Sequence, residues 1–194
     1  MFIIWPFNMH KKKAFFFDRD NTIIQDNGYT FKKKNLKFLP GVIKAFKYLK
    51  KKNFYIMVIT NQSGIARGYF NKRQVDEFHR YMNKVLGKKG SNIDDFFVCG
   101  CHPDIPKKNK KCKCRKPSPF MLLQALKKRS LKRESVFMIG DKLTDKIASK
   151  RAKIKFYYKS KKKDLYNQIK NILSYNIIWK LLLKLAGIIL EIWN

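Results

Sequence analysis

The chain has 194 residues, of which 45% are hydrophobic. These values exclude a chain too short or too polar to bury a core, and they predict one domain with an appendage. The formal net charge of +32 suggests phosphate-bearing partners, either nucleic acid or an anionic membrane. The alternative is compositional drift that leaves a solvated basic surface. We favour drift because the basic residues are mostly scattered lysines, whereas base readout favours Arg, and we still expect non-specific nucleic-acid binding at low salt.

The N-terminal residues 1–11 are expected to form an arm. Their apolar patch is too short for a signal peptide and has neither a basic lead-in nor a small-residue cleavage site. We therefore expect a cytoplasmic protein. Its core domain is predicted over residues 12–160, followed by an apolar helical extension over residues 161–194.

Strand and helix patterns alternate through the core. Short apolar runs predict buried strands over residues 14–17, 54–59, 96–98 and 136–139, and an edge strand over 154–158. Helical spacing predicts helices over residues 42–51, 72–86, 118–128 and 145–150. A strand, helix, strand order implies parallel pairs with right-handed crossovers. The sequence therefore predicts an α/β fold with a doubly wound, mostly parallel sheet.

Oxygen-bearing side chains follow three of these strands. Asp18 and Asp20 are two residues apart, so in an extended chain they share a face at the end of the first strand. Open α/β sheets bind ligands at that end. Two carboxylates there repel each other unless a cation lies between them, and Mg²⁺ is the simplest choice. A turn or a helix cap remains the alternative for this motif taken alone.

The other two strand ends carry similar groups. Thr60 and Asn61 follow the second strand, and Asp141 and Asp145 follow the fourth. The pair Arg115-Lys116 adds positive charge. Phosphoryl transfer from a monoester needs a nucleophile, a metal, fixed donors and an acid, and these groups together can supply them.

Four ordered motifs resemble the haloacid dehalogenase superfamily of phosphatases. They are DRDNT from residue 18, TNQSGIARG from residue 60, CRKP from residue 114 and GDKLTD from residue 140, and the resemblance covers residues 12–158. Within the superfamily the chain is similar to the heptose-bisphosphate phosphatases, which have the histidinol-phosphate phosphatases as sisters. The resemblance implies an Mg²⁺-dependent phosphoric monoester hydrolase that removes the C7 phosphate of a heptose 1,7-bisphosphate for lipopolysaccharide core supply.

The resemblance also implies roles for single residues. Asp18 would be the nucleophile that forms an aspartyl-phosphate, and Asp20 would be the acid and then the base. Mg²⁺ would be held by Asp18, the backbone carbonyl of Asp20 and Asp141, while Asp145 would orient a lysine. Thr60 and the backbone of Asn61 would bind the transferring phosphoryl group. The substrate-binding residues would be Asp26, Asn27, Gly28, Tyr29, Thr60, Asn61, Gln62, Ser63, Arg115, Lys116 and Lys142.

Two features bear on the shape of the site. Asn21 stands where the family usually has Gly, and Asn tolerates a left-handed backbone better than most residues, so we expect the turn to survive. The gaps after the first two strands are too short for the large caps that some superfamily members insert. We therefore expect an open site without a cap domain, suited to a substrate with its own bulk or a second anionic group.

Four cysteines lie within residues 99–114. The spacing of Cys99, Cys101, Cys112 and Cys114 matches a tetrahedral structural zinc site, with free thiols and two disulfides as alternatives. The missing signal peptide argues against disulfides. The resembling phosphatases carry a zinc loop here with a Cys-x-His ligand pair, so His102 is the alternative to Cys101. Zinc would pin the loop and position Arg115 and Lys116.

Residues 177–193 are strongly apolar with a narrow polar stripe. A helix packed on the domain or on a second chain is favoured over an interfacial membrane helix. We expect a monomer that acts on a small sugar phosphate. The alternative functions are histidinol-phosphate phosphatase, nucleic-acid 3′-phosphatase, which the charge would suit, and a non-catalytic binding module.

Overall fold

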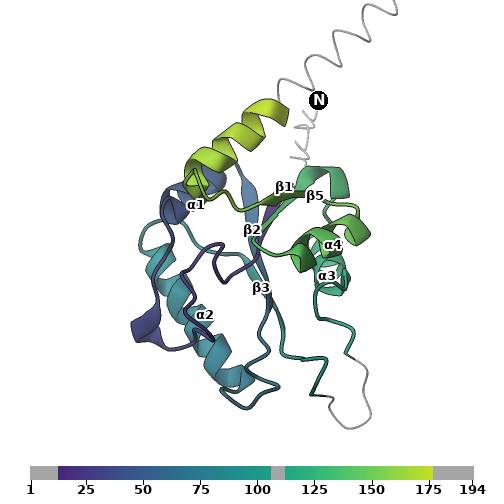
Figure 1. Cartoon of the computed structure of the whole chain (residues 1–194). Coiled ribbons are helices and arrows are strands. Elements are labelled where there is room, and N and C mark those ends of the chain that lie inside the picture. The colour runs from purple at the N-terminus through teal and green to yellow at the C-terminus, as the bar shows by residue number, and fades with distance from the viewer. Residues whose placement is uncertain (1–12, 106–111, 177–194) are drawn as a thin grey trace, which may run out of the picture.

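One parallel sheet organises the chain. The structure is a computed structural model that describes residues 13–105 and 112–176. Its sheet has the strand order β3-β2-β1-β4-β5 (Figure 1). The strands are β1 (Lys13–Phe17), β2 (Phe54–Asn61), β3 (Asp95–Cys99), β4 (Val136–Gly140) and β5 (Lys155–Tyr158). The strand order reverses between β1 and β4, which confirms the predicted doubly wound α/β fold.

Helices cover both faces of this sheet. They are α1 (Val42–Lys51), α2 (Lys72–Gly87), α3 (Phe120–Lys128) and α4 (Leu143–Ala152), with short 3-10 helices at Lys33–Asn35 and Arg133–Ser135. Because successive strand residues face opposite sides, Phe15 and Phe17 join the core under α1 and α2, whereas Ala14 and Phe16 join the core under α3 and α4. The aromatic run after Lys13 is thus buried on both faces.

Two helices begin at other residues than predicted. Helix α3 begins at Phe120, two residues later than expected, with Pro119 as its N-cap. Helix α4 begins at Leu143, two residues earlier, because the Asp145 carboxylate accepts a hydrogen bond from the Lys142 backbone at 3.1 Å. That bond satisfies one of the free N–H groups at the helix start.

The core continues past the expected boundary at residue 160. Residues 165–176 are helical, and Leu165, Ile169 and Ile172 are buried in the same cluster as Phe46. The helical part of the expected extension of 161–194 thus packs on the core of the domain. The predicted arm and the apolar segment 177–193 lie outside the described residues. In the described ranges, no helix has the length and apolarity needed to cross a membrane.

The connections after β1 and β2 are short. A loop with one 3-10 helix, followed by α1, joins β1 to β2, and α2 joins β2 to β3. Neither connection contains a further domain, and both lie fully within the described residues, so the expectation of a site without a cap is confirmed here.

Candidate active site

The carboxyl ends of β1, β2 and β4 surround a pocket of about 390 Å³. Residues from all three strand ends line it, as the topology of an open α/β sheet predicts. The lining contains these residues that the sequence singled out: Asp18, Asp20, Asn61, Ser63, Arg115, Lys116, Lys142 and Asp145. Pro103, Pro117 and Thr144 complete it and were not expected.

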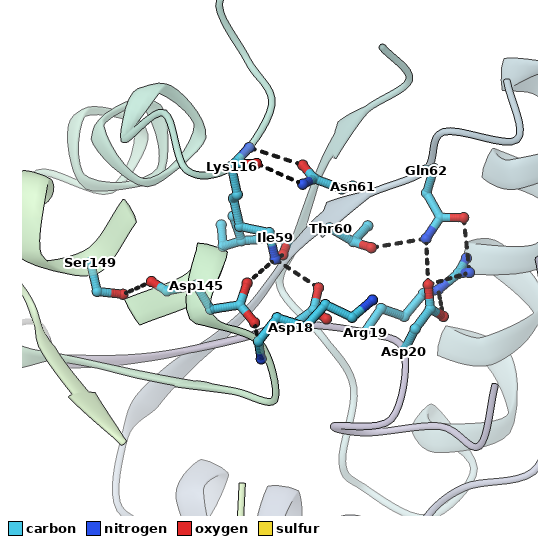
Figure 2. Close-up of polar contacts among 11 residues, drawn as sticks. Asp18, Arg19, Asp20, Ile59, Thr60, Asn61, Gln62, Lys116, Asp145 and Ser149 are labelled. Atoms are coloured by element: carbon cyan, nitrogen blue, oxygen red, sulfur yellow. Dashed lines mark hydrogen bonds and ion pairs between the residues drawn. The ribbon is translucent and has the colours of Figure 1, made fainter. Parts of the chain in front are cut away.

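Lys116 is the buried cation of this pocket. It is 2% exposed, and its Nζ lies 2.7 Å from Asp18 Oδ1 and 2.6 Å from Asp145 Oδ1 (Figure 2). Its Nζ also donates to the Ile59 carbonyl at 2.7 Å. Burial lowers the pKa of Lys116, but the two carboxylates outweigh burial and raise it, so the ammonium stays charged.

Asn61 fixes the backbone of Lys116. Its side-chain Nδ2 donates to the Lys116 carbonyl and its Oδ1 accepts from the Lys116 N–H, both at 3.1 Å. Figure 2 shows this pair of bonds above the lysine side chain. The end of β2 thus holds the segment that carries Arg115 and Lys116 against the end of β1.

Three carboxylates converge beside the lysine. Oxygens of Asp18, Asp141 and Asp145 lie within 4.8 Å of one another. Burial and the negative charge of Asp18 raise the pKa of Asp141 to about 6. Asp141 Oδ1 is buried and has no hydrogen-bond partner among the described residues. Both oxygens of Asp145 are engaged, one by Lys116 and one by the Lys142 N–H, so Asp18 and Asp141 are the oxygens available to a cation.

The Asp20 side chain lies apart from these three carboxylates. Its Oδ1 accepts from Arg19 Nε at 2.7 Å, and its Oδ2 accepts from Gln62 Nε2 at 2.8 Å. Burial raises the pKa of Asp20, and the Arg19 charge opposes that rise. The side chain still lines the pocket, so its carboxyl group can reach a bound substrate from the Gln62 side.

Some residues predicted to bind substrate lie outside the pocket lining. Thr60 is fully buried, and its hydroxyl accepts from Gln62 Nε2 at 2.9 Å. Gln62 itself points at Asp20. In the loop Asp26–Tyr29, the Asp26 carboxylate caps the Thr30 N–H at 3.0 Å. The Tyr29 ring packs edge-on against Tyr69 at 4.7 Å.

Asn21 takes the left-handed backbone that the turn requires, with φ of 55°. Its side-chain Oδ1 also accepts a hydrogen bond from the Asp26 N–H at 3.1 Å. Gly could adopt the same backbone but could not make this bond. The expectation that Asn keeps the turn is confirmed.

Arg19 and His79 contribute to the site and were not predicted. Arg19 is fully buried beside Asp20, and His79 on α2 lies 3.2 Å from its guanidinium. A signal existed for Arg19, since a charged residue directly between two motif carboxylates needs a buried partner. In the sequence, His79 is only one polar residue on the apolar face of a helix, so nothing there indicates its contact with Arg19.

The four cysteines form a cluster with all sulfurs within 4.8 Å of one another. The pairs Cys99–Cys112, Cys101–Cys114 and Cys112–Cys114 are 3.7 Å apart. Four thiolates around zinc at about 2.3 Å would be separated by roughly 3.8 Å, so the cluster has the size of a zinc site. Burial raises the pKa of Cys112, but hydrogen bonds from Cys101 and nearby backbone N–H groups outweigh it and favour the thiolate.

One pair in the cluster differs from the prediction. Cys99 and Cys114 form a disulfide, where the sequence led us to expect thiols. Their Cα atoms are 5.5 Å apart, which is within the reach of such a bond. The disulfide and a four-thiolate zinc site exclude each other, because zinc binds the deprotonated thiol. Zinc binding by all four sulfurs therefore requires the reduced protein.

His102 lies outside the sulfur cluster. Its Nε2 is 2.8 Å from Arg67 Nη2, and its Nδ1 is 3.2 Å from the Asp104 backbone nitrogen. Cys101 rather than its neighbour His102 thus completes the group of four. The cluster also reaches the pocket, because Arg115 Nη1 donates to the Cys101 carbonyl at 2.9 Å.

Known proteins are similar to this chain in both sequence and fold. The family model described as polynucleotide kinase 3 phosphatase matches residues 13–177. Proteins named D-glycero-beta-D-manno-heptose-1,7-bisphosphate 7-phosphatase from Pasteurella multocida and Escherichia coli K12 are 41% and 39% identical over 145 and 143 residues. These matches cover 74% and 73% of this chain, and 79% and 75% of the relatives. The chain belongs to this phosphatase family of the haloacid dehalogenase superfamily.

Solved structures of the superfamily agree with this assignment. A protein of Mesorhizobium loti described as a HAD-like phosphatase has a TM-score of 0.69 and 32% identity, covering 74% of this chain and 69% of that one. The D,D-heptose 1,7-bisphosphate phosphatase of B. bronchiseptica, solved with magnesium and phosphate, has a TM-score of 0.69 at 24% identity, covering 84% and 99%. The latter shows the shared fold. This member of the superfamily is accordingly a phosphoric monoester hydrolase, which rules out the non-catalytic binding module.

Proposed function

We propose that the chain removes the C7 phosphate of D-glycero-D-manno-heptose 1,7-bisphosphate in an Mg²⁺-dependent reaction. The observation that carries the proposal is the identity of about 40% to relatives that bear the name of this activity, over 73% or more of the chain. The reaction would serve ADP-heptose supply for lipopolysaccharide core in the cytoplasm. The pocket supports it with a carboxylate pair, Asp18 and Asp20, at the end of β1.

The chemistry would take two steps through an aspartyl-phosphate. In the first, an Asp18 oxygen attacks phosphorus, the bond to the sugar oxygen breaks, and Asp20 gives its proton to that leaving oxygen. In the second, water attacks phosphorus, Asp20 takes the proton from water, and the bond to Asp18 breaks to release inorganic phosphate. Lys116, held 2.7 Å from Asp18, would neutralise charge on the transferring group in both steps.

The residues fit a magnesium ion. Asp18 and Asp141 offer carboxylate oxygens, one of them without a partner among the described residues, and the Asp20 backbone carbonyl would be the third ligand. Burial first, and then the negative charge of Asp18, raises the pKa of Asp141, and a cation would neutralise that charge. Bound there, Mg²⁺ would offset the repulsion between the Asp18 carboxylate and the phosphate. Asp145 would orient Lys116 rather than bind the ion, because both of its oxygens are engaged.

The substrate-binding roles fall into two groups. Asn61, Ser63, Arg115, Lys116 and Lys142 line the pocket and would contact the phosphates directly. Thr60 and the loop Asp26–Tyr29 would act from outside the lining, and Gln62 would act through Asp20. Reduced Cys99, Cys101, Cys112 and Cys114 would hold a structural zinc ion that places Arg115.

A substrate panel tests the proposal. We expect phosphate release from the heptose 1,7-bisphosphate with Mg²⁺ to exceed release from histidinol phosphate and from DNA ending in a 3′-phosphate by at least tenfold. Asp18→Asn should abolish turnover, because the amide cannot form the phosphorylated intermediate. Ser174→Ala, at an exposed position far along the chain, serves as the control. A preference for histidinol phosphate would overturn the heptose assignment.

A nucleic-acid 3′-phosphatase is the second candidate. The matching family model bears that description, and the net charge of +32 would favour a polyanionic substrate. This function predicts turnover of the 3′-phosphorylated DNA at low salt, with a steep loss as salt is raised. The relatives at about 40% identity favour the sugar phosphate.

A further inference from the structure

Arg19 is a fully buried cation one residue away from each motif carboxylate. A charged side chain is stable inside a protein only when its donors are paired. Arg19 Nε donates to Asp20 Oδ1 at 2.7 Å and Nη2 donates to Asp20 Oδ2 at 3.1 Å, so the guanidinium grips the carboxyl group with two parallel bonds. Such two-point contacts fix orientation as well as distance.

The Nη2 nitrogen of Arg19 contacts two more groups besides Asp20. Arg19 Nη2 also lies 2.8 Å from the Thr30 carbonyl and 2.9 Å from Gln62 Oε1. Gln62 completes a closed set of bonds, because its Nε2 donates both to Asp20 Oδ2 and to the Thr60 hydroxyl. Figure 2 shows Gln62 between Thr60 and the Arg19–Asp20 pair. Each oxygen of Asp20 therefore has a fixed donor.

The Nη1 nitrogen of Arg19 connects this set of hydrogen bonds to helix α2. Arg19 Nη1 lies 3.2 Å from His79 Nε2, and the guanidinium sits 5.4 Å from the centre of the Phe78 ring. Burial and the charge of Arg19 hold the pKa of His79 well below its ordinary value, so the ring is neutral and Nε2 accepts the bond. The His79 ring stacks on Phe96 of β3 at 4.3 Å, which fixes its direction.

We propose that Arg19, Gln62 and His79 form a buried positioning unit that holds the Asp20 carboxyl group in the orientation used for proton transfer. The inference rests on the proposed role of Asp20 as acid and then base. None of the three needs to touch the substrate, since Arg19, Gln62 and His79 do not line the pocket. The unit gives α2, from which no residue lines the described pocket, a part in positioning the proton donor.

A comparison of two kinds of substrate distinguishes a role in positioning Asp20 from a merely structural role. An alkyl leaving group needs a proton as its bond to phosphorus breaks, whereas 4-nitrophenolate leaves without one. Both substrates form the same phosphorylated Asp18, whose hydrolysis needs Asp20 as base. A misplaced Asp20 therefore slows the first step for alkyl phosphates only, and slows the second step for both. General acid–base catalysis typically contributes about 10²–10⁴-fold, which bounds the effect.

The experiment uses the full chain with Mg²⁺ and compares Gln62→Met, His79→Phe and His79→Gln. Gln62→Met and His79→Phe keep approximate size but remove the polar contacts, so turnover of the fastest sugar phosphate should fall roughly 10–100-fold. With 4-nitrophenyl phosphate, the same variants should release a rapid burst of up to one nitrophenolate per chain, followed by slow turnover. His79→Gln restores an acceptor for Arg19 and should recover most of the sugar-phosphate rate lost in His79→Phe.

Asn83→Ala is the matched control. Asn83 lies one turn further along α2 and bonds the Ile93 backbone at 2.7 and 3.0 Å, so its loss disturbs the helix without touching Asp20. The inference is overturned if Gln62→Met and His79→Phe match this control, or if they lower the burst and both turnover rates equally. Failure of the proposed chemistry looks different, because Asp18→Asn and Asp20→Asn would then keep full activity.

Discussion

Charge is unevenly balanced among the residues of the pocket. One buried ammonium, Lys116, faces the carboxylates of Asp18 and Asp145 directly, and Asp141 lies beside them, where the nearby charge of Lys142 opposes the rise in its pKa. Burial first, and then the negative charge of Asp18, raises the pKa of Asp141 to about 6. The ionised form of Asp141 is therefore expected to lower the stability of the folded chain near neutral pH until a cation binds.

Asp141→Asn tests this imbalance. In the wild-type chain without Mg²⁺, the folded-state pKa near 6 exceeds the unfolded value, so the free energy of unfolding should fall as pH rises from about 4 to 7. The variant lacks this titration and should be more stable at pH 7 by about 1–2 kcal/mol, after allowance for partial exposure. Urea unfolding with a chelator measures it. A variant that is less stable at pH 7 and titrates like the wild type would contradict the idea.

The same residues show what the sequence could predict about the site. Asp18 and Lys116 were predicted because they lie in motifs whose residue order reflects strand ends. The direction of a side chain beyond a strand end was not predictable, so Gln62 was expected in the pocket and instead points at Asp20. His79 was missed because its contact with Arg19 joins residues 60 positions apart and leaves no local pattern.

The helices and strands differ in how well their ends follow from the sequence. The helix Val42–Lys51 agrees residue for residue with its prediction, since its apolar spacing and the preceding Gly41 are local signals. The starts of α3 and α4 depend on Pro119 and on the Asp145 side chain, which periodicity does not detect. The helical residues 165–176 were assigned to an extension because the resemblance to known phosphatases ends at residue 158.

This last helix completes one core of the domain. Leu165 and Ile169 are fully buried, and Gly41 leaves so little room that a Cβ there would lie 2.9 Å from the Asp164 side chain. The positive φ of 79° at Gly41 also disfavours other residues. The chain entering α1 and the chain entering the last helix thus pack closely against each other.

Ile169→Ala measures the contribution of this packing. Truncation of a fully buried Ile should lower the free energy of unfolding by about 2–4 kcal/mol, because lost burial and the new cavity add together. Ser174→Ala, on the exposed side of the same helix, should change it by less than about 0.5 kcal/mol. Denaturant unfolding compares the two. Equal stability of both variants would show that residues 161–176 are an appendage, as the sequence first indicated.

At the scale of the whole molecule, the cysteine cluster connects the sheet to the pocket. Cys99 ends β3, Cys114 precedes the pocket residue Arg115, and the Arg115 side chain bonds the Cys101 carbonyl. A metal at the cluster would therefore fix both the backbone and the side chain of Arg115. Positioning at this distance does not require the metal to touch the substrate.

Zinc removal tests this connection. Reduced protein should hold one zinc per chain, and Cys112→Ser should lose it, with a fall in Tm of about 5 °C and a rise in KM as Arg115 loosens. His102→Ala should keep the metal, since His102 lies outside the sulfur cluster. Elemental analysis, thermal unfolding and steady-state kinetics supply the three readouts. Chelation that leaves both Tm and KM unchanged would refute a structural zinc.

The ion pairs of Lys116 join residues that lie far apart in the chain. A ribosome releases Asp18 early, whereas Lys116 follows 98 residues later and Asp145 later still. Until those residues emerge, the Asp18 carboxylate lacks its counter-charge, and the helix at residues 165–176 must pack before the core is closed. We therefore expect a chain that stops before Asp145 to release no phosphate, because it lacks the ion pairs that hold Lys116 beside Asp18.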